Sequence, residues 1–187
     1  MINLNLKEKS FDDKVILKDI SLQIEKGDIL SITGQSGIGK STLLRILAGL
    51  DTDFKGEITN TFKSSSISFP EKVFLGRISA IKEIKLVSRA SYSEIEKAME
   101  YFDLLTLKNN LVKTMSTGQR TRISLIRSIL SNSEIIYLDE PLMGLDFNNK
   151  KLATDYILNN LNGRALVYTG ASLNFKNEKI IELTQEN

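Results

Sequence analysis

The octapeptide Gly-Gln-Ser-Gly-Ile-Gly-Lys-Ser, residues 34–41, constrains the fold more than any other part of the sequence. It fits the pattern G-x-x-x-x-G-K-[ST], whose glycines let the backbone curl so that successive N–H groups point inward. An apolar stretch at residues 29–33 precedes it, and apolar residues recur at helical spacing between residues 41 and 50. A helix that follows such a loop presents its positive end to an anion. The sequence therefore predicts a phosphate-binding loop between a strand and a helix.

This loop predicts a site for ATP bound with Mg²⁺. We expect the Lys40 ammonium to bind the β- and γ-phosphates and to act in catalysis, and the Ser41 hydroxyl suits Mg²⁺. The alternative is a glycine-rich turn that fits the pattern by chance, and the flanking strand and helix argue against it. The residues expected to contact the nucleotide are Gly34, Gln35, Ser36, Gly37, Ile38, Gly39, Lys40, Ser41 and Thr42.

Two acidic residues follow an apolar stretch at residues 135–138. An acid at the carboxyl end of a parallel strand faces the crevice where ligands bind in α/β proteins. We therefore expect Asp139 to help hold Mg²⁺ and Glu140 to act as the general base that activates the attacking water. The alternative is a buried strand that leaves the core through a polar turn.

Strand and helix patterns alternate along most of the chain, which predicts an α/β fold with a mostly parallel sheet. Residues 2–6 and 20–24 alternate with period two and are expected to form N-terminal antiparallel β strands. Residues 78–107 are helical in pattern and heavily charged, so we expect a single domain, residues 1–187, with a helical subdomain at about 75–130. Further helices are expected at residues 116–130 and 148–161, and further strands at 56–59, 66–69, 134–139, 165–169 and 179–183.

Composition excludes several classes of function. The net charge of +2 and the lack of a basic run argue against a nucleic-acid partner. The chain has no cysteine and no histidine, which excludes disulfides, thiolate zinc sites, cysteine nucleophiles and the commonest general base. No apolar run approaches the roughly 20 residues of a membrane helix, and the N-terminus does not resemble a signal peptide. We therefore expect a cytoplasmic protein without direct membrane insertion, which reaches a membrane only through another subunit.

The segment Met115-Ser116-Thr117-Gly118-Gln119 resembles the signature sequence of ATP-binding cassette (ABC) ATPases, usually Leu-Ser-Gly-Gly-Gln. It lies between the phosphate loop and the acidic strand, as in that family, and Gly144-Leu145-Asp146 follows. The resemblance covers nearly the whole chain. It implies a phosphate-loop NTPase core with a small, shortened helical subdomain, in a motor subunit that hydrolyses ATP to power solute transport through a separate integral membrane permease. The location implied is the inner face of the cell membrane.

The resemblance also implies an assembly and further site residues. Ser116 is expected to cap a helix, and Ser116, Gly118 and Gln119 are expected to contact ATP held by a second cassette, in a homo- or heterodimer. Asp146 is expected to communicate across the same interface. Phe11 corresponds to the aromatic that stacks on adenine in the family, and a core position is the alternative for it.

Three residues depart from the family pattern. Pro70 stands where the family has a glutamine that touches Mg²⁺, with Glu71 beside it as a carboxylate that could substitute, and Gly170 stands where it has a histidine that contacts the γ-phosphate. Thr117 replaces the first glycine of the signature. ATP binding is expected regardless, and two functions stay open: a motor that hydrolyses ATP, and a regulatory cassette with slow or no hydrolysis. A DNA- or ribosome-associated ATPase and a phosphate-loop kinase fit less well. The transported substrate and the direction of transport are not disclosed by the sequence.

Overall fold

The computed structural model describes residues 1–69 and 74–184, and the chain divides into two units. The first unit consists of residues 1–67, 133–139 and 163–187, and the second of residues 68–132 and 140–162. Pro70 and Glu71, the site of one predicted departure from the family pattern, lie outside the described residues. The predicted single domain, with its helical subdomain at about 75–130, stays a prediction.

The first unit begins with an antiparallel sheet in the strand order β2-β1-β4. In it, β1 (Ile2–Phe11) pairs with both β2 (Lys14–Ile24) and β4 (Lys55–Asn60). Ile2, Leu4 and Leu6 of β1 are buried and the residues between them exposed, as expected for a strand that covers a core with one face only; the alternation ends after Leu6, where the register with β4 shifts. The predicted N-terminal antiparallel strands are therefore confirmed.

The second sheet of this unit has the strand order β5-β6-β7-β3-β8. Its described pairs, β3 with β7, β3 with β8 and β6 with β7, are all parallel, which confirms the predicted fold class. Every residue of β6 and β7 is buried, the pattern typical of central parallel strands. The strands are β3 (Ile29–Gly34), β5 (Ser65–Ser68), β6 (Ile135–Leu138), β7 (Ala165–Thr169) and β8 (Lys179–Leu183).

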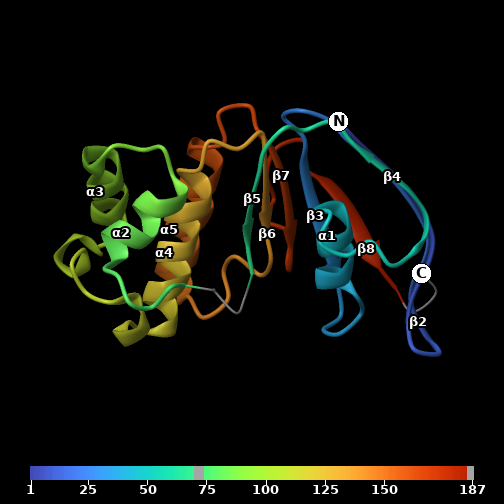
Figure 1. Ribbon diagram of the computed structural model, residues 1–187, viewed down its shortest axis with the longest axis horizontal. Helices are drawn as coiled ribbons and strands as arrows, with labels where there is room; N and C mark the ends of the chain where they lie inside the picture. The colour runs from blue at the N-terminus through green and yellow to red at the C-terminus, as the bar shows by residue number, and fades with distance from the viewer. Residues whose placement is uncertain (70–73, 185–187) are drawn as a thin grey trace. The chain divides into compact units, whose positions relative to one another are not determined.

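One helix, α1 (Lys40–Leu47), packs against this parallel sheet beside β3 and β7, as Figure 1 shows. Its buried face is formed by Leu43, Leu44, Ile46 and Leu47, which join the inward residues of β1, β3 and β6 in one core cluster. The carboxyl end of β3 is thereby held directly before the amino end of α1. That junction is the predicted phosphate loop.

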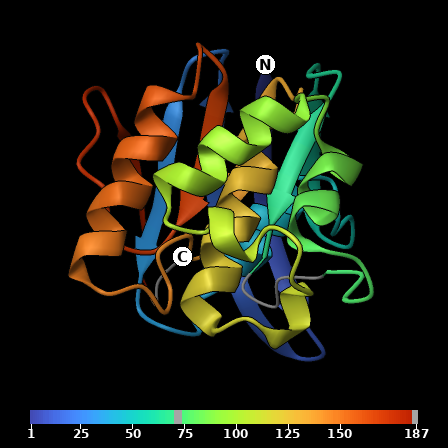
Figure 2. The same cartoon turned by 90° about the vertical axis from the view of Figure 1, so that its left-hand side faces the viewer.

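The second unit is helical and contains α2 (Ala80–Val87), α3 (Tyr92–Tyr101), α4 (Thr117–Ile129) and α5 (Phe147–Asn159). Figure 2 shows these four helices in colours from green to orange, and α4 contacts each of the other three. The expected helical stretch at residues 78–107 is divided, because an extended Ser88 ends α2 and a capping box of Ser91 with Glu94 starts α3. Short 3₁₀ turns lie at Leu105–Leu107 and Val112–Thr114. Within the described residues, no helix is long and apolar enough to span a membrane.

Candidate nucleotide site

The predicted phosphate loop connects β3 to α1, with Gly34 as the last strand residue and Gly39 as the residue that caps the helix. Gly39 has φ 113°, and a Cβ there would lie 2.8 Å from Cδ2 of Leu17. At Gly34, φ is 131° and a Cβ would lie 2.6 Å from the Leu183 carbonyl oxygen. Only glycine fits these two positions, because both the backbone conformation and the close neighbours exclude a side chain.

The amino end of α1 carries no side-chain cap and no acidic residue in its first turn. By contrast, α3 and α4 both begin with a complete capping box. The first N–H groups of a helix have no partner within the helix, so an uncapped end that points out of a glycine loop suits an anion. All of the predicted loop residues, 34–42, lie in this loop and the first turn of α1.

The Lys40 ammonium folds back over the loop. Its Nζ donates to the carbonyl oxygens of Gly34, at 3.0 Å, and of Gln35, at 2.9 Å. These two acceptors are neutral backbone carbonyls. A bound phosphate would offer charged oxygens to the same ammonium, and hydrogen bonds between ionised groups are the stronger ones.

Asp139, directly after β6, accepts two hydrogen bonds on one carboxylate oxygen. The Ser41 hydroxyl donates to Oδ1 at 3.0 Å and the Thr169 hydroxyl at 2.5 Å. Asp139 is 3% exposed, and no donor of the described residues reaches the other oxygen, Oδ2. Ser41 and Asp139 were predicted from distant parts of the sequence as the metal residues, and the structure brings them together.

The unpartnered Oδ2 of Asp139 tests whether these residues fit Mg²⁺. A buried carboxylate oxygen without a hydrogen bond costs free energy unless a cation or water satisfies it. Mg²⁺ prefers hard oxygen ligands and uses one or two protein groups together with phosphate and water. One carboxylate and one hydroxyl at the end of a phosphate loop fit that requirement.

Thr169 is a site residue that sequence reasoning missed. It is the last residue of β7, is 1% exposed and follows Tyr168, which pairs with Leu138 of β6. Because Asp139 follows Leu138, the parallel register places Thr169 and Asp139 side by side at the carboxyl edge. The signal available in the sequence was a hydroxyl residue at the carboxyl end of the predicted strand 165–169, which comes after the strand that ends in Asp139.

Glu140 directly follows Asp139 and has a left-handed backbone, with φ 48°. A non-glycine residue in this region carries about 1 kcal/mol of strain. Its carbonyl accepts from the Met143 N–H at 3.0 Å, in the turn that leads to Gly144 and Asp146. Six other non-glycine residues of the described chain share a positive φ, so the role of Glu140 as general base stays a prediction.

The predicted signature residues lie at the amino end of α4. Ser116 caps the helix, as predicted: its hydroxyl accepts from the Gln119 N–H at 3.2 Å, and the Gln119 side chain accepts from the Ser116 N–H at 2.9 Å. Gly118 packs so closely that a Cβ there would lie 3.1 Å from the Gly144 carbonyl oxygen. Thr117 fills the space beside Gly144, since a Cβ at Gly144 would lie 3.0 Å from its Cγ2.

Arg122 links the signature helix to Asp146. Its guanidinium donates to the Gly118 carbonyl at 3.3 Å and to Oδ1 of Asn149 at 2.9 Å. Asn149 in turn donates to both carboxylate oxygens of Asp146, from its N–H at 2.8 Å and its side-chain amide at 2.9 Å. These hydrogen bonds hold the pKa of Asp146 below its usual range. The Asp146 carboxylate therefore caps α5, and the start of α4 and the start of α5 form one connected network.

Phe11 is the last residue of β1 and is 50% exposed. The alternative that it belongs to the core is therefore wrong. The Nζ of Lys9 lies 4.6 Å from its ring centroid. An exposed aromatic ring in contact with a cation is suited to stacking on a planar ligand.

A family profile described as "ABC transporter" matches residues 17–143 of the chain. The chain belongs to the ABC transporter family. The aliphatic sulfonates import ATP-binding protein SsuB 1 of Pseudomonas savastanoi pv. phaseolicola is 31% identical over 160 residues, which is 84% of this chain and 68% of that protein. The spermidine/putrescine import ATP-binding protein PotA of Bacillus cereus is 33% identical over 168 residues, which is 81% of this chain and 51% of that protein. The chain thus spans from about half to two thirds of the length of these relatives.

Solved structures of ABC cassettes have the same fold. A Pyrococcus furiosus protein assigned as an ABC transporter ATP-binding protein superposes with a TM-score of 0.84 at 27% identity, over 97% of this chain and 96% of that one. The cassette MJ0796, a dimer in a post-hydrolysis state bound to ADP and Pi, superposes with a TM-score of 0.80 at 24% identity, over 98% and 94% of the two chains. The second likeness bears on the fold alone.

Gly170, at the histidine position of the ABC pattern, has φ 115° and donates its N–H to the Ile32 carbonyl at 3.2 Å. The segment after Gly170 is held by hydrogen bonds to Tyr168, whose hydroxyl donates to Glu178 and accepts from the Leu173 N–H at 2.7 Å. Burial, with Glu178 beside it, raises the pKa of Tyr168, so this phenol keeps its proton. Gly170 therefore offers no side chain at the histidine position, and its backbone has a positive φ that favours glycine.

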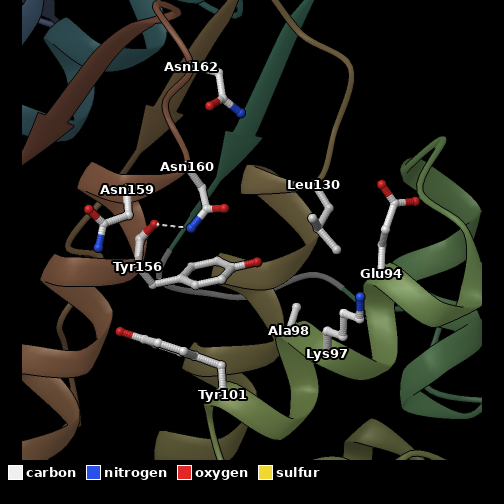
Figure 3. Close-up of a pocket in the computed structure, with 9 residues that line it drawn as sticks. All are labelled: Glu94, Lys97, Ala98, Tyr101, Leu130, Tyr156, Asn159, Asn160 and Asn162. Atoms are coloured by element: carbon white, nitrogen blue, oxygen red, sulfur yellow. Dashed lines mark hydrogen bonds between the residues drawn. The ribbon is translucent and has the colours of Figure 1, made fainter.

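The second unit of the cassette also contains a pocket of about 420 Å³, which is drawn in Figure 3. Tyr101 and Tyr156, with ring centroids 5.3 Å apart, line it together with Asn159, Asn160 and Asn162. The Asn160 side chain donates to the Tyr156 carbonyl at 2.8 Å. None of the predicted nucleotide residues lines this pocket.

Proposed function

We propose that this chain is the ATP-binding and ATP-hydrolysing motor subunit that powers solute transport through a separate integral membrane permease. The observation that carries the proposal is the buried group in which Ser41 and Thr169 donate to Asp139 at the end of the phosphate loop. Relatives about one third identical over four fifths of this chain bear names of import ATP-binding proteins, which supports the same assignment. On this proposal the chain works on the cytoplasmic face of the membrane.

In the proposed binding step, the N–H groups of residues 34–42 surround the phosphates of ATP. The Lys40 ammonium exchanges its two carbonyl acceptors for oxygens of the β- and γ-phosphates. Ser41 and Asp139 would hold Mg²⁺, whose charge, when it is bound, offsets that of the phosphates. The exposed ring of Phe11 stacks on the adenine base.

In the proposed hydrolysis step, Glu140 acts as the general base. Its carboxylate takes a proton from the water whose oxygen bonds to the γ-phosphorus. The bond from that phosphorus to the bridging oxygen breaks, and its electron pair stays on the new ADP, while Lys40 compensates the charge. The products are ADP and inorganic phosphate, and Glu140 returns the proton to solvent.

On this proposal the amino end of α4, which carries the signature residues, binds the nucleotide held by a second cassette. Ser116, Gly118 and Gln119 would place the helix amino end against the γ-phosphate of ATP held by the partner cassette, of the same or a different chain. Closure of two cassettes on ATP, and their release after hydrolysis, would supply the motion that a permease uses.

A steady-state ATPase assay tests the proposal. Wild-type protein, with its permease where that is required, should release phosphate, and Glu140→Gln should lower the rate by about 100-fold or more. Lys55→Ala, a surface change in β4, serves as the matched control and should leave the rate unchanged. A wild-type rate no higher than that of Glu140→Gln would overturn the motor function.

A second candidate is a regulatory cassette that closes on ATP and turns over slowly or not at all. The observation that favours it is Gly170, which has no side chain to contact the γ-phosphate and a positive φ that favours glycine. Dimerisation driven by ATP, without phosphate release above that of Glu140→Gln, would select this function over the motor.

A further inference from the structure

Lys9 is a charged residue inside the first unit that the proposed function does not yet use. It lies in β1 and is 1% exposed, with its Nζ 2.9 Å from Oδ1 of Asp51, 2.5 Å from the Asp53 carbonyl oxygen and 3.5 Å from Oδ2 of Asp53. Burial alone would lower its pKa, but the hydrogen bonds and charges of these aspartates outweigh burial and raise it. Lys9 is therefore a buried ammonium at neutral pH, fully paired.

The partners of Lys9 come from a distant part of the sequence. Asp51 and Asp53 lie after the carboxyl end of α1, the helix that directly follows the phosphate loop. The Asp53 N–H donates to Oδ1 of Asp51 at 3.1 Å. The ammonium thus connects β1 to the segment that leaves α1. The ammonium is buried, whereas the Asp53 side chain is exposed and that of Asp51 largely covered. Any shift of β1 relative to that segment would leave the buried ammonium without these acceptors, which is costly.

The same ammonium reaches the ring of Phe11. Its Nζ lies 4.6 Å from the ring centroid, within the range of a cation–π interaction. Phe11 is 50% exposed as a residue, so it contacts both the Lys9 ammonium and solvent. A half-exposed phenylalanine at a strand end would otherwise sample several rotamers, each with a different ring direction.

We propose that Lys9 is a positioning residue for the nucleotide base, which fixes the ring of Phe11 so that its exposed face stacks on adenine. The inference rests on the proposed function, because Phe11 can only serve a base if residues 34–42 bind the triphosphate. Lys9 acts through Phe11 and through the anchored segment at Asp51, and does not touch the nucleotide.

Calorimetric titration of the full chain with two probes tests this role. MgATP reports on base and phosphates together, whereas Mg²⁺-tripolyphosphate reports on the phosphate loop without a base. Lys9→Met and Phe11→Leu should each weaken MgATP binding about five- to tenfold and leave tripolyphosphate binding within about twofold. The double variant should bind MgATP no more weakly than Phe11→Leu does.

Lys55→Met is the matched control, since it removes an exposed lysine of the same sheet that pairs with Glu8 at 2.9 Å. It should change neither affinity. If Lys9→Met does not fold, Asp51→Asn takes its place: it keeps an oxygen acceptor, removes the charge that anchors Lys9, and should weaken MgATP binding selectively.

The outcomes separate the two claims. Equal loss for both probes in Lys9→Met would make Lys9 a structural residue only and overturn the inference, as would an unchanged MgATP affinity in Lys9→Met or Phe11→Leu. Failure of the wild-type chain to bind either probe would instead overturn the proposed function. Selective loss for MgATP in both single variants supports the inference.

Discussion

Thr169 donates a hydrogen bond of 2.5 Å to Oδ1 of Asp139, the same oxygen that accepts from Ser41. The carboxylate is thereby fixed in rotation, with its second oxygen, Oδ2, buried and without a donor among the described residues. Groups that orient a metal ligand affect affinity nearly as much as the ligand itself does. The relationship explains how one acidic side chain can be set for a metal before the metal binds.

Replacement of Thr169 by valine should therefore weaken metal binding about tenfold. The change removes the hydroxyl and keeps the shape, so Asp139 loses its strongest orienting contact. Binding of Mn²⁺ in the presence of ADP, followed by electron paramagnetic resonance, measures the effect. Thr169→Ser, which keeps the hydroxyl, should bind as the wild type does, and an unchanged affinity in Thr169→Val would refute the orienting role.

Gly170→His should not restore a histidine-dependent reaction. Because φ at Gly170 is 115°, any L side chain there should cost about 1–2 kcal/mol of stability. Urea unfolding should show the loss, and Gly170→Ala should show it equally, since the cause lies in the backbone. A histidine variant that is both as stable as the wild type and faster in phosphate release would contradict the expectation.

Asn149→Ala should weaken ATP-driven dimerisation, because Arg122 and Asp146 lose the residue that connects them. We expect about a fivefold effect, the scale of one hydrogen bond. Light scattering after size exclusion measures it in the Glu140→Gln background, where ATP is retained. The neighbouring Asn148→Ala is the control, and equal dimerisation in both variants would exclude the network from that role.

Asp146 predicts a pH dependence of stability. Its pKa is lowered by the N–H and the amide of Asn149, so the folded state favours the ionised carboxylate. Its contribution is present above the pKa of the unfolded chain, near 4, and is lost as pH falls through the lower folded pKa. The wild type should melt above Asp146→Ala at pH 7, and the gap should narrow towards pH 3. A difference in melting temperature that grows towards pH 3 would contradict the lowered pKa of Asp146.

The sequence was informative wherever a local pattern determined the structure. The loop at residues 34–41, the cap at Ser116 and the strand at 165–169 were all predicted correctly, because glycine spacing, capping chemistry and apolar runs are local. The proximity of Ser41 and Asp139 also followed, since parallel strands end at one edge.

The features that could not be predicted depend on the register of strand pairing and on contacts between residues far apart in the sequence. Thr169 was missed because its place beside Asp139 requires the pairing of Leu138 with Tyr168. The burial of Lys9 could not be predicted from the sequence, because its aspartate partners lie 42 and 44 positions along the chain. The exposure of Phe11 likewise depended on how β1 ends.

The central claim is that residues 34–42, with Lys40 at their centre, bind the phosphates of ATP. The most direct measurement is the equilibrium affinity for MgATP of the wild type and of Lys40→Met, both purified as the full chain. We predict saturable binding by the wild type and at least a tenfold weaker affinity in the variant, because a charge-assisted contact is lost. Equal affinities, or no saturable binding by the wild type, would contradict the account.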